Sequence, residues 1–293
     1  MFLKHFHLRS EPFAVAPDPA FFYPGPEHRE ALASLFYVIM QRRGCGLMAA
    51  GPGMGKTLVL NCLCEQIASF ADVIFLHGPM SGNELIDSLA ASLGILEASG
   101  RYWKLRAIEQ VLTRKGRHGR RTVLIIEGVE QLHGVAIEAL QTLIALETRE
   151  GKLLDVLLAA QPILTDTLSS PKFERLRQSI DVSCRLAPFD EMRTAEYLWH
   201  RVMKAGSKRS LFTKEAAGLL ATATRGIPRL INQFANQTLT AAWSRNVAQV
   251  DEDVVWGVLY DLPVSDLPVA DLAEWGRGLS ASSPKQLMAV SHV

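Results

Sequence analysis

The sequence predicts an α/β fold in which a five-stranded parallel sheet is followed by a small C-terminal domain of helices. Two observations support this prediction: apolar runs alternate with amphipathic helical segments up to Pro188, and only helical periodicity follows. Apolar runs that are separated by helices are typical of parallel strands covered on both faces. The predicted strands are 46–50, 72–76, 122–126, 153–160 and 180–186.

Helical periodicity explains most of the chain between and after these strands. Ser81 and Glu84 have the spacing of a capping box, in which each side chain accepts a hydrogen bond from the other residue's backbone. Helices are therefore predicted after Ser81 and at about 28–42, 56–70, 101–115 and 134–148, and then at about 190–205, 213–224, 228–245 and 251–260.

These patterns divide the chain into four parts. Residues 1–27 are rich in proline and aromatic residues, which argues against a regular helix and predicts a segment packed on the core that follows. Residues 28–188 are predicted to form the α/β domain and residues 189–262 the helical domain. Residues 263–293 show little periodicity and are predicted to be a loose tail.

The composition indicates an ordinary globular protein, with 48% hydrophobic and 21% charged residues among 293. The net charge of +1 argues against a surface that binds nucleic acid through bulk charge. The four cysteines follow no metal-binding spacing and are interpreted as reduced packing residues. No apolar stretch has the length of a signal peptide or a membrane span, so we expect a cytoplasmic protein without a membrane span.

The stretch AGPGMGKT, residues 50–57, predicts a nucleotide site. Its glycines let the backbone wrap so that N–H groups point at phosphate oxygens, and the following helix adds its dipole. Lys56 is expected to reach the β- and γ-phosphates of ATP, and the Thr57 hydroxyl to bind Mg²⁺. The predicted ATP-binding residues of this loop are Ala50, Gly51, Pro52, Gly53, Met54, Gly55, Lys56, Thr57 and Leu58.

The stretch VLIIEGVEQL, residues 123–132, ends a strand with Glu127, where P-loop NTPases place a carboxylate that holds the metal. The next position commonly carries a catalytic glutamate but is Gly128 here. Either Glu127 or Glu130 could polarise the attacking water, although Glu130 could equally be a solvated acid at a helix start. We expect sound Mg-ATP binding with slow hydrolysis, because losing a positioned base costs on the order of 10²–10⁴ in rate.

Together with the N-terminal stretch FHLRSEPFAVAPDPAFFYPGPEHREAL, LETREGKLLDVLLAAQPIL at 146–164 and GIPRLIN at 226–232, these motifs resemble a known family. It is the general secretion pathway protein A (ExeA-like) family of AAA+ ATPases. ATPases encoded with exopolysaccharide or exosortase systems and transposition ATPases of the TniB type are related to it. The resemblance runs from about Phe6 to Leu262 and implies an AAA+ fold in which the helical domain is a lid. It does not include the transmembrane and peptidoglycan-binding portion of the secretion members, so we do not expect this chain to anchor a pore.

The resemblance also implies roles for further residues. Gln161 matches the sensor 1 position that reads the γ-phosphate; otherwise it is a loop residue before Pro162. Arg229, in GIPRLIN, matches the sensor 2 arginine that reaches back to the γ-phosphate. An arginine finger is expected from Arg175 or Arg177, although the family usually has Gln-Arg immediately before the last strand, where this chain has Gln178-Ser179.

Three functions are compatible with these residues. The first is an AAA+ ATPase that assembles as a homo-oligomer and switches or remodels a protein partner in an export or polysaccharide-assembly complex. The second is a transposition regulator that binds DNA, favoured only by the basic run RKGRHGRR between Arg114 and Arg121, which could equally be a solvated turn. The third is a scaffold that binds nucleotide without hydrolysing it, as Gly128 allows.

Overall fold

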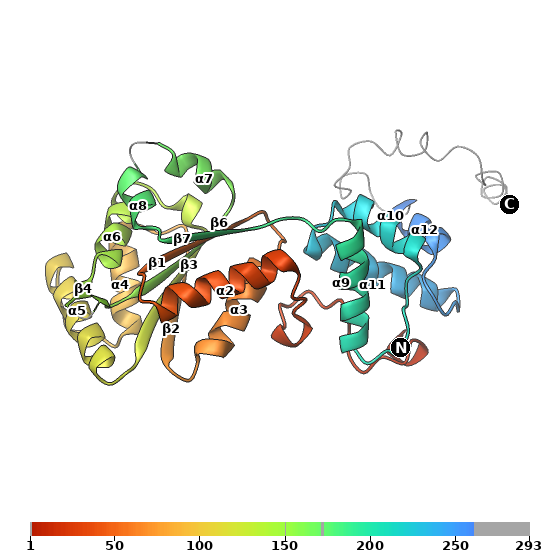
Figure 1. The fold of residues 1–293 in the computed structure, drawn as a ribbon, viewed down its shortest axis with the longest axis horizontal. Helices are drawn as coiled ribbons and strands as arrows, with labels where there is room; N and C mark the ends of the chain where they lie inside the picture. Colours follow the sequence, from red (N-terminus) through yellow and green to blue (C-terminus); the bar gives the residue numbers. More distant parts are fainter. Residues whose placement is uncertain (1, 150, 171–172, 261–293) are drawn as a thin grey trace.

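The computed structural model describes residues 2–149, 151–170 and 173–260. The predicted tail, 263–293, lies outside the described residues. The α/β part contains a parallel sheet of five strands in the order β2-β3-β6-β1-β7, which confirms the predicted fold class (Figure 1). The strands are β1 (Cys45–Ala50), β2 (Ala71–His77), β3 (Arg121–Glu127), β6 (Asp155–Ala160) and β7 (Val182–Leu186).

Helices cover both faces of this sheet. One face packs against α2 (Pro26–Met40) and α3 (Lys56–Ile67), and the other against α4 (Gly82–Ser92), α5 (Arg101–Arg117) and α6 (Val135–Ile144). The central strands β1 and β6 are buried along their whole length, as expected for strands covered on both faces. The predicted capping box is present at the start of α4, where Ser81 and Glu84 bond each other's backbone N–H.

A small hairpin replaces the end of one predicted helix. The helix expected at about 134–148 ends at Ile144, and β4 (Glu147–Thr148) then pairs with β5 (Gly151–Lys152). The turn suits Gly151, whose φ of +118° lies in a region that residues with a Cβ rarely adopt. Two short helices, α7 (Ile163–Leu168) and α8 (Glu174–Ser179), lie between β6 and β7.

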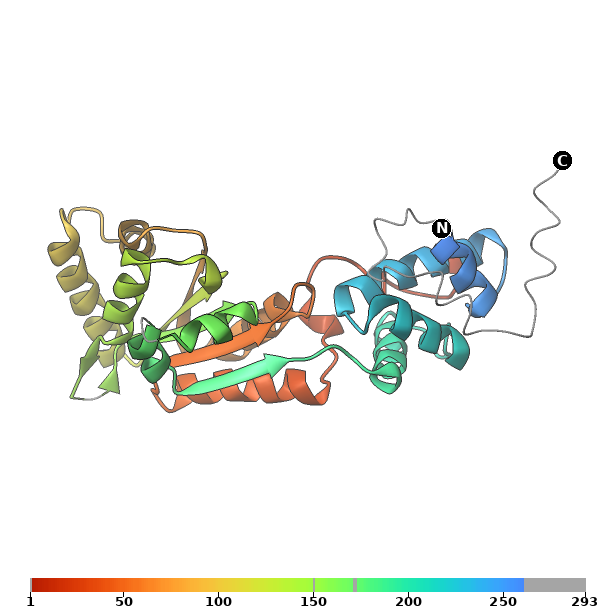
Figure 2. The ribbon, with the colours of Figure 1, turned by 90° about the horizontal axis from the view of Figure 1, so that it is seen from above.

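The C-terminal part contains the helices α9 (Glu191–Lys204), α10 (Lys214–Thr224), α11 (Pro228–Ser244) and α12 (Glu252–Tyr260). They enclose a hydrophobic core separate from the two cores that flank the sheet. Figure 2 shows the chain crossing from β7 to α9 beside the N-terminal segment that leads into α2. Among the described residues, no helix combines the length and apolar character needed to cross a bilayer.

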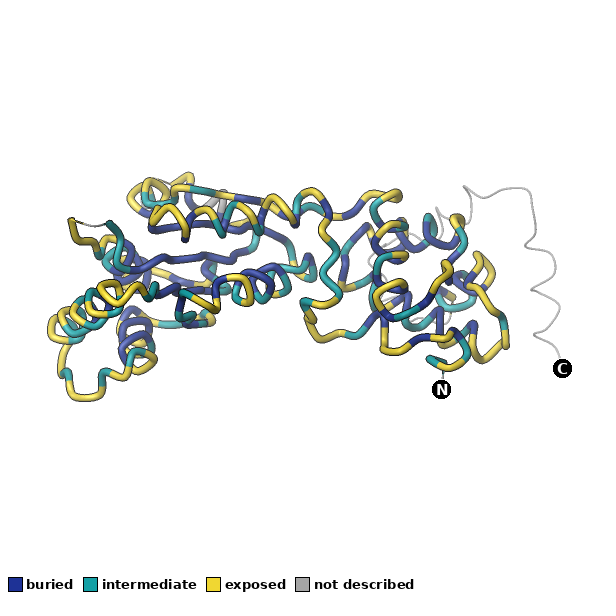
Figure 3. Tube along the Cα trace, turned by 60° about the horizontal axis from the view of Figure 1, so that its bottom comes forward, coloured by how far each residue is buried: buried dark blue, intermediate teal, exposed yellow. Residues whose placement is uncertain are grey.

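Several aromatic residues of the N-terminal segment pack on these C-terminal helices. It contains α1 (Phe2–His5) and η1 (Pro19–Phe21), and both Phe6 and Phe13 are fully buried in the helical core. Its backbone is anchored by the buried Arg201 of α9, which donates to the Pro12 carbonyl. Phe22 of the same segment packs against the core that contains α2 and α3, so the segment contacts both parts of the chain. Buried and exposed stretches alternate along the trace of both parts (Figure 3).

A buried ion pair joins the amino ends of β3 and β6. Arg121 Nε lies 3.0 Å from Asp155 Oδ2, whereas Asp155 Oδ1 has no hydrogen-bond partner among the described residues. Burial raises the pKa of the Asp155 carboxyl to about 6, although the Arg121 guanidinium acts in the opposite direction. The neutral form of Asp155 is therefore favoured more in the folded protein than in the unfolded chain.

This raised pKa predicts a pH dependence of stability. The contribution of Asp155 is fully present below about pH 4 and is lost as the pH rises through about 6. We expect the free energy of unfolding of the wild type, relative to Asp155→Asn, to fall by about 1 kcal/mol between about pH 5 and about pH 7. Denaturant titrations of both proteins at the two pH values measure this difference. If the wild type instead became more stable relative to Asp155→Asn as the pH rises, the pKa of Asp155 would be lowered by Arg121 more than it is raised by burial.

Candidate nucleotide-binding site

The phosphate loop connects β1 to α3 at the carboxyl edge of the sheet, between the two parts of the molecule (Figure 1). Gly53 and Gly55 have φ values of +75° and +91°, and Gly55 is the N-cap of α3. The ammonium of Lys56 donates to the carbonyls of Ala50 (2.7 Å) and Gly51 (3.0 Å). The loop thus has the strand–turn–helix context that a phosphate-binding loop requires.

Charge and burial act on Lys56 in opposite directions. Partial burial is the larger effect and lowers the pKa of its ammonium, and the nearby Arg229 lowers it further. The carboxylates of Glu127 and Glu130 raise it. The pKa of Lys56 is therefore shifted by three predicted site residues: Glu127 at the end of β3, Glu130 in the turn after it, and Arg229 on α11.

The two predicted metal ligands lie together. The Thr57 hydroxyl donates to Glu127 Oε1 at 3.2 Å, although the two residues are 70 positions apart. Their oxygens are the hard donors that Mg²⁺ prefers, so this pair fits the ion. On the other side, His77 Nδ1 lies 3.6 Å from Glu127 Oε2. Sequence reasoning missed His77, yet it ends the strand β2 that pairs with β3 and is directly opposite Glu127.

Glu130 also turns toward the strand ends. Gly128 adopts a left-handed conformation, with φ of +78°, and the turn η2 (Val129–Gln131) follows. In this turn Glu130 Oε2 accepts a hydrogen bond from the backbone N–H of Gln161 at 3.1 Å. Glu130 therefore lies half-buried in the first turn of η2, with its carboxylate bonded to the loop after β6. Gln161 follows β6 directly, and this bond joins it to the loop after β3.

The helical part contacts the loop through the start of α11. The backbone N–H of Arg229 donates to the Gly53 carbonyl at 3.1 Å, and its side chain is exposed beside Lys56. A Cβ on Gly53 would lie 2.9 Å from Arg229 Cβ, so the loop needs glycine for this contact. A second link joins α2 to α9 through an ion pair between Glu27 and Arg193.

His28 is a further supporting residue that the sequence did not reveal. Its ring is buried, and Nε2 donates to the carbonyl of Met54 in the phosphate loop at 3.1 Å. Burial lowers the pKa of this imidazole, so the neutral ring is the form that supports the loop. The only sequence signal was a polar residue on the otherwise apolar face of the helix that contains Leu32 and Leu35.

The two candidate finger residues lie away from the loop. Arg175 and Arg177 are on α8, and both side chains are exposed. Among the described residues, neither makes a hydrogen bond or ion pair with the phosphate loop, Glu127 or Glu130. Within one chain, the structure does not bring these arginines to the site.

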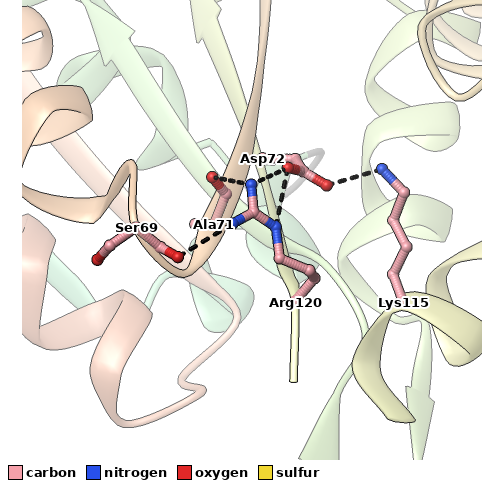
Figure 4. A network of polar contacts seen from close by, with 5 residues as sticks. All are labelled: Ser69, Ala71, Asp72, Lys115 and Arg120. Atoms are coloured by element: carbon pink, nitrogen blue, oxygen red, sulfur yellow. Dashed lines mark hydrogen bonds and ion pairs between the residues drawn. The ribbon is translucent and has the colours of Figure 1, made fainter. Parts of the chain in front are cut away.

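Part of the basic run between Arg114 and Arg121 forms internal contacts, and Figure 4 shows those of Lys115 and Arg120 with Asp72. Asp72 accepts hydrogen bonds from both Lys115 (2.9 Å) and Arg120 (3.1 Å from Nε), and these hold the pKa of its carboxyl below the usual range. Arg121 pairs with Asp155 as described above. The run therefore has two kinds of cation: Lys115, Arg120 and Arg121 form ion pairs, whereas Arg114 and Arg117 on α5 are exposed.

The fold and the loop define the class of this protein. Residues 39–168 match the family model described as an AAA domain, which implies nucleotide binding. The chain is similar to general secretion pathway protein A of Aeromonas hydrophila, with 29% identity over 282 residues that make up 95% of this chain. This confirms the resemblance predicted from the motifs. The match covers 51% of that protein, so the chain spans about half the length of its relative.

Solved structures support the fold. Cdc6p from Pyrobaculum aerophilum has 17% identity and a TM-score of 0.59, with 86% of this chain and 76% of that one covered. The ORC2 protein of Aeropyrum pernix has 13% identity and a TM-score of 0.64, with coverages of 83% and 71%. The RuvB Holliday junction branch migration motor of Thermotoga maritima has 17% identity and a TM-score of 0.55, with coverages of 80% and 70%. At these identities the TM-scores show a common fold and nothing further.

Proposed function

We propose that this protein binds Mg-ATP at residues 50–58 and hydrolyses it slowly until a partner completes the site. The observation that carries the proposal is the hydrogen bond between Thr57 and Glu127 beside the Lys56 ammonium. Thr57 and Glu127 would supply oxygens for Mg²⁺. Lys56, at the N-terminus of α3, would supply a cation for phosphate. The similar ORC2 protein is described in complexes with ADPNP and ADP, which is consistent with a nucleotide at this position.

The two parts of the chain would have different tasks. Residues 28–188 would form the nucleotide-binding domain and residues 189–262 a lid, with residues 1–27 as a segment that packs beside them. Arg229 would act from the lid on the γ-phosphate, and Gln161 from the sheet edge. This assignment is supported by the contact between Arg229 and Gly53, through which closure of the lid would reach the phosphate loop.

Hydrolysis would depend on Glu130, because Gly128 has no side chain to polarise water. Mg²⁺ held by Thr57 and Glu127 would neutralise charge on the phosphates. The arginine finger would be Arg175 or Arg177 of a second copy, since both are exposed and apart from the site of their own chain. A homo-oligomer is therefore part of the proposal, and its formation would limit the rate.

The similarity to general secretion pathway protein A supports a partner in a secretion complex. The partner would belong to an export or polysaccharide-assembly complex and would be bound at the cytoplasmic side. ATP binding and hydrolysis would switch that complex. A transposition regulator that binds DNA is the alternative. The ion pairs of Asp72 and Asp155 engage Lys115, Arg120 and Arg121 of the basic run that favoured it, whereas Arg114 and Arg117 stay exposed. A scaffold without turnover remains a third function that the experiment below distinguishes.

Phosphate release from ATP by the purified protein, measured across protein concentrations, tests the proposal. We expect a low rate per chain that rises with protein concentration, because the finger comes from a neighbour. Lys56→Ala is the control, and it is expected to abolish both release and ATP binding. A wild-type rate no higher than that of Lys56→Ala, with ATP binding intact in the wild type, would favour the scaffold.

A further inference from the structure

Helix α5 is the least buried of the helices that cover the sheet. Of its 17 residues only Ile108 and Leu112 are buried, and they pack in the core beneath the helix. The opposite side is open to solvent. Six residues recur there at intervals typical of one helical face, and we call them the α5 outer face. They are Tyr102, Trp103, Arg106, Gln110, Arg114 and Arg117.

The cations of α5 are divided between its two sides. Lys104 pairs with Asp87 at 2.6 Å and Lys115 with Asp72 at 2.9 Å, so the cations near the sheet are neutralised. Arg114 and Arg117 are exposed and have no ion pair within the described part of the chain. Arg106 pairs only with Glu109, three residues on, and such surface pairs contribute little. The outer face therefore carries an excess of positive charge.

Two large aromatic rings lie at the beginning of this face. Tyr102 is 65% exposed and Trp103 66% exposed, and their ring centroids are 5.2 Å apart in an edge-on arrangement. The loop 97–99 and α5 border a shallow, open hollow beside these rings, which Arg106, Gln110 and the acid Glu97 line. Burying this much aromatic surface would be favourable, yet nothing within the described chain covers it.

We propose that the α5 outer face binds single-stranded nucleic acid. The aromatic rings would stack on unpaired bases, and the arginines would contact the phosphates that follow. From Trp103 to Arg117 the helix rises about 21 Å, which is long enough for several nucleotides. A duplex hides the faces of its bases, so it would lose the contribution of the rings. This inference is independent of the ATPase proposal, since neither Lys56 nor Glu127 takes part.

Anisotropy of a fluorescein-labelled oligo(dT) of about 20 nucleotides, titrated with the full chain at low and moderate salt, tests the inference. The double variant Arg114→Ala/Arg117→Ala is expected to weaken binding about tenfold. The slope of log binding constant against log salt concentration is expected to become less negative by about 1.4, because two phosphate contacts are lost. Trp103→Ala is expected to weaken binding by roughly 5- to 100-fold, with little change in that slope. Circular dichroism checks that the variants are folded.

The control is Lys208→Ala/Lys214→Ala, which removes the same charge from exposed positions on the helical part. It is expected to leave affinity within about twofold, because charges beyond the Debye length are screened. Absence of oligo(dT) binding at low salt, or equal losses in both double variants, would overturn the proposal. Duplex binding as tight as that of the single strand would also overturn it. So would polyglutamate competing as well as oligo(dT), because the face would then recognise acidic proteins.

Discussion

Replacing Glu130 with glutamine is expected to lower the rate of phosphate release by roughly 10²–10⁴-fold while leaving ATP affinity within about twofold. Glutamine keeps an oxygen that can accept from the Gln161 N–H, so the turn after Gly128 is preserved. It loses the negative charge needed to polarise water. The rate of phosphate release and the affinity for a fluorescent ATP analogue, measured on the same preparation, give the two quantities.

Two further variants make this result specific. Glu138→Gln, an exposed acid on α6, removes the same charge away from the site and is expected to keep the wild-type rate. Glu127→Gln is expected to weaken ATP binding in the presence of Mg²⁺ but not in its absence, since Glu127 would hold the metal. The roles would be reversed if Glu130→Gln retained turnover and Glu127→Gln bound Mg-ATP normally without hydrolysing it.

Replacing Gly226 with alanine is expected to destabilise the helical part by about 3 kcal/mol or more. Gly226 has a φ of +67°, and an added Cβ would lie 1.8 Å from the Phe189 carbonyl oxygen. The backbone at Phe189 cannot easily move away, because its N–H donates to the Gly226 carbonyl at 2.9 Å. Ile227 and Arg229 follow this turn and contact the phosphate loop, so ATP affinity is expected to fall as well.

Gly218→Ala is the matched control for this substitution. Gly218 lies inside α10, and its added Cβ would meet only the end of the Glu191 side chain, at 3.0 Å. Alanine favours the helix by up to about 1 kcal/mol, so stability is expected to stay equal or rise. Denaturant unfolding of both variants measures the effects. A loss of less than about 1 kcal/mol in Gly226→Ala would show that the turn adapts.

The sequence predicted the sheet and the site around it because both depend on local patterns. Buried parallel strands appear as apolar runs, and a phosphate loop needs glycines and Lys56 at fixed spacing. Glu127 was found because a carboxylate that ends an apolar strand lies at the edge where parallel strands end. The short hairpin after α6 was not found, since its strands have only two residues each and leave no periodicity to recognise.

Other features were decided by contacts between distant residues. The spacing of Glu130 allowed either a solvated or an inward side chain, and the left-handed turn at Gly128 with the Gln161 N–H gives the inward one. The basic run looked free in sequence until Asp72 and Asp155 were placed beside it. His28 acquired its partner only when α2 packed beside the phosphate loop, and His77 only when β2 paired with β3.

The sequence by itself therefore determined the class of fold and the position of the phosphate loop, and it predicted which residues would hold Mg-ATP. The tertiary structure decided where the N-terminal aromatic segment packs, which cations remain exposed on α5 and which carboxylate faces the strand ends. The physical reason is that loop and strand propensities act over a few residues. Contacts between distant residues depend on the folded arrangement as a whole. Examples are the ion pair of Lys115 with Asp72, 43 residues away, and the packing of Phe13 against Phe212.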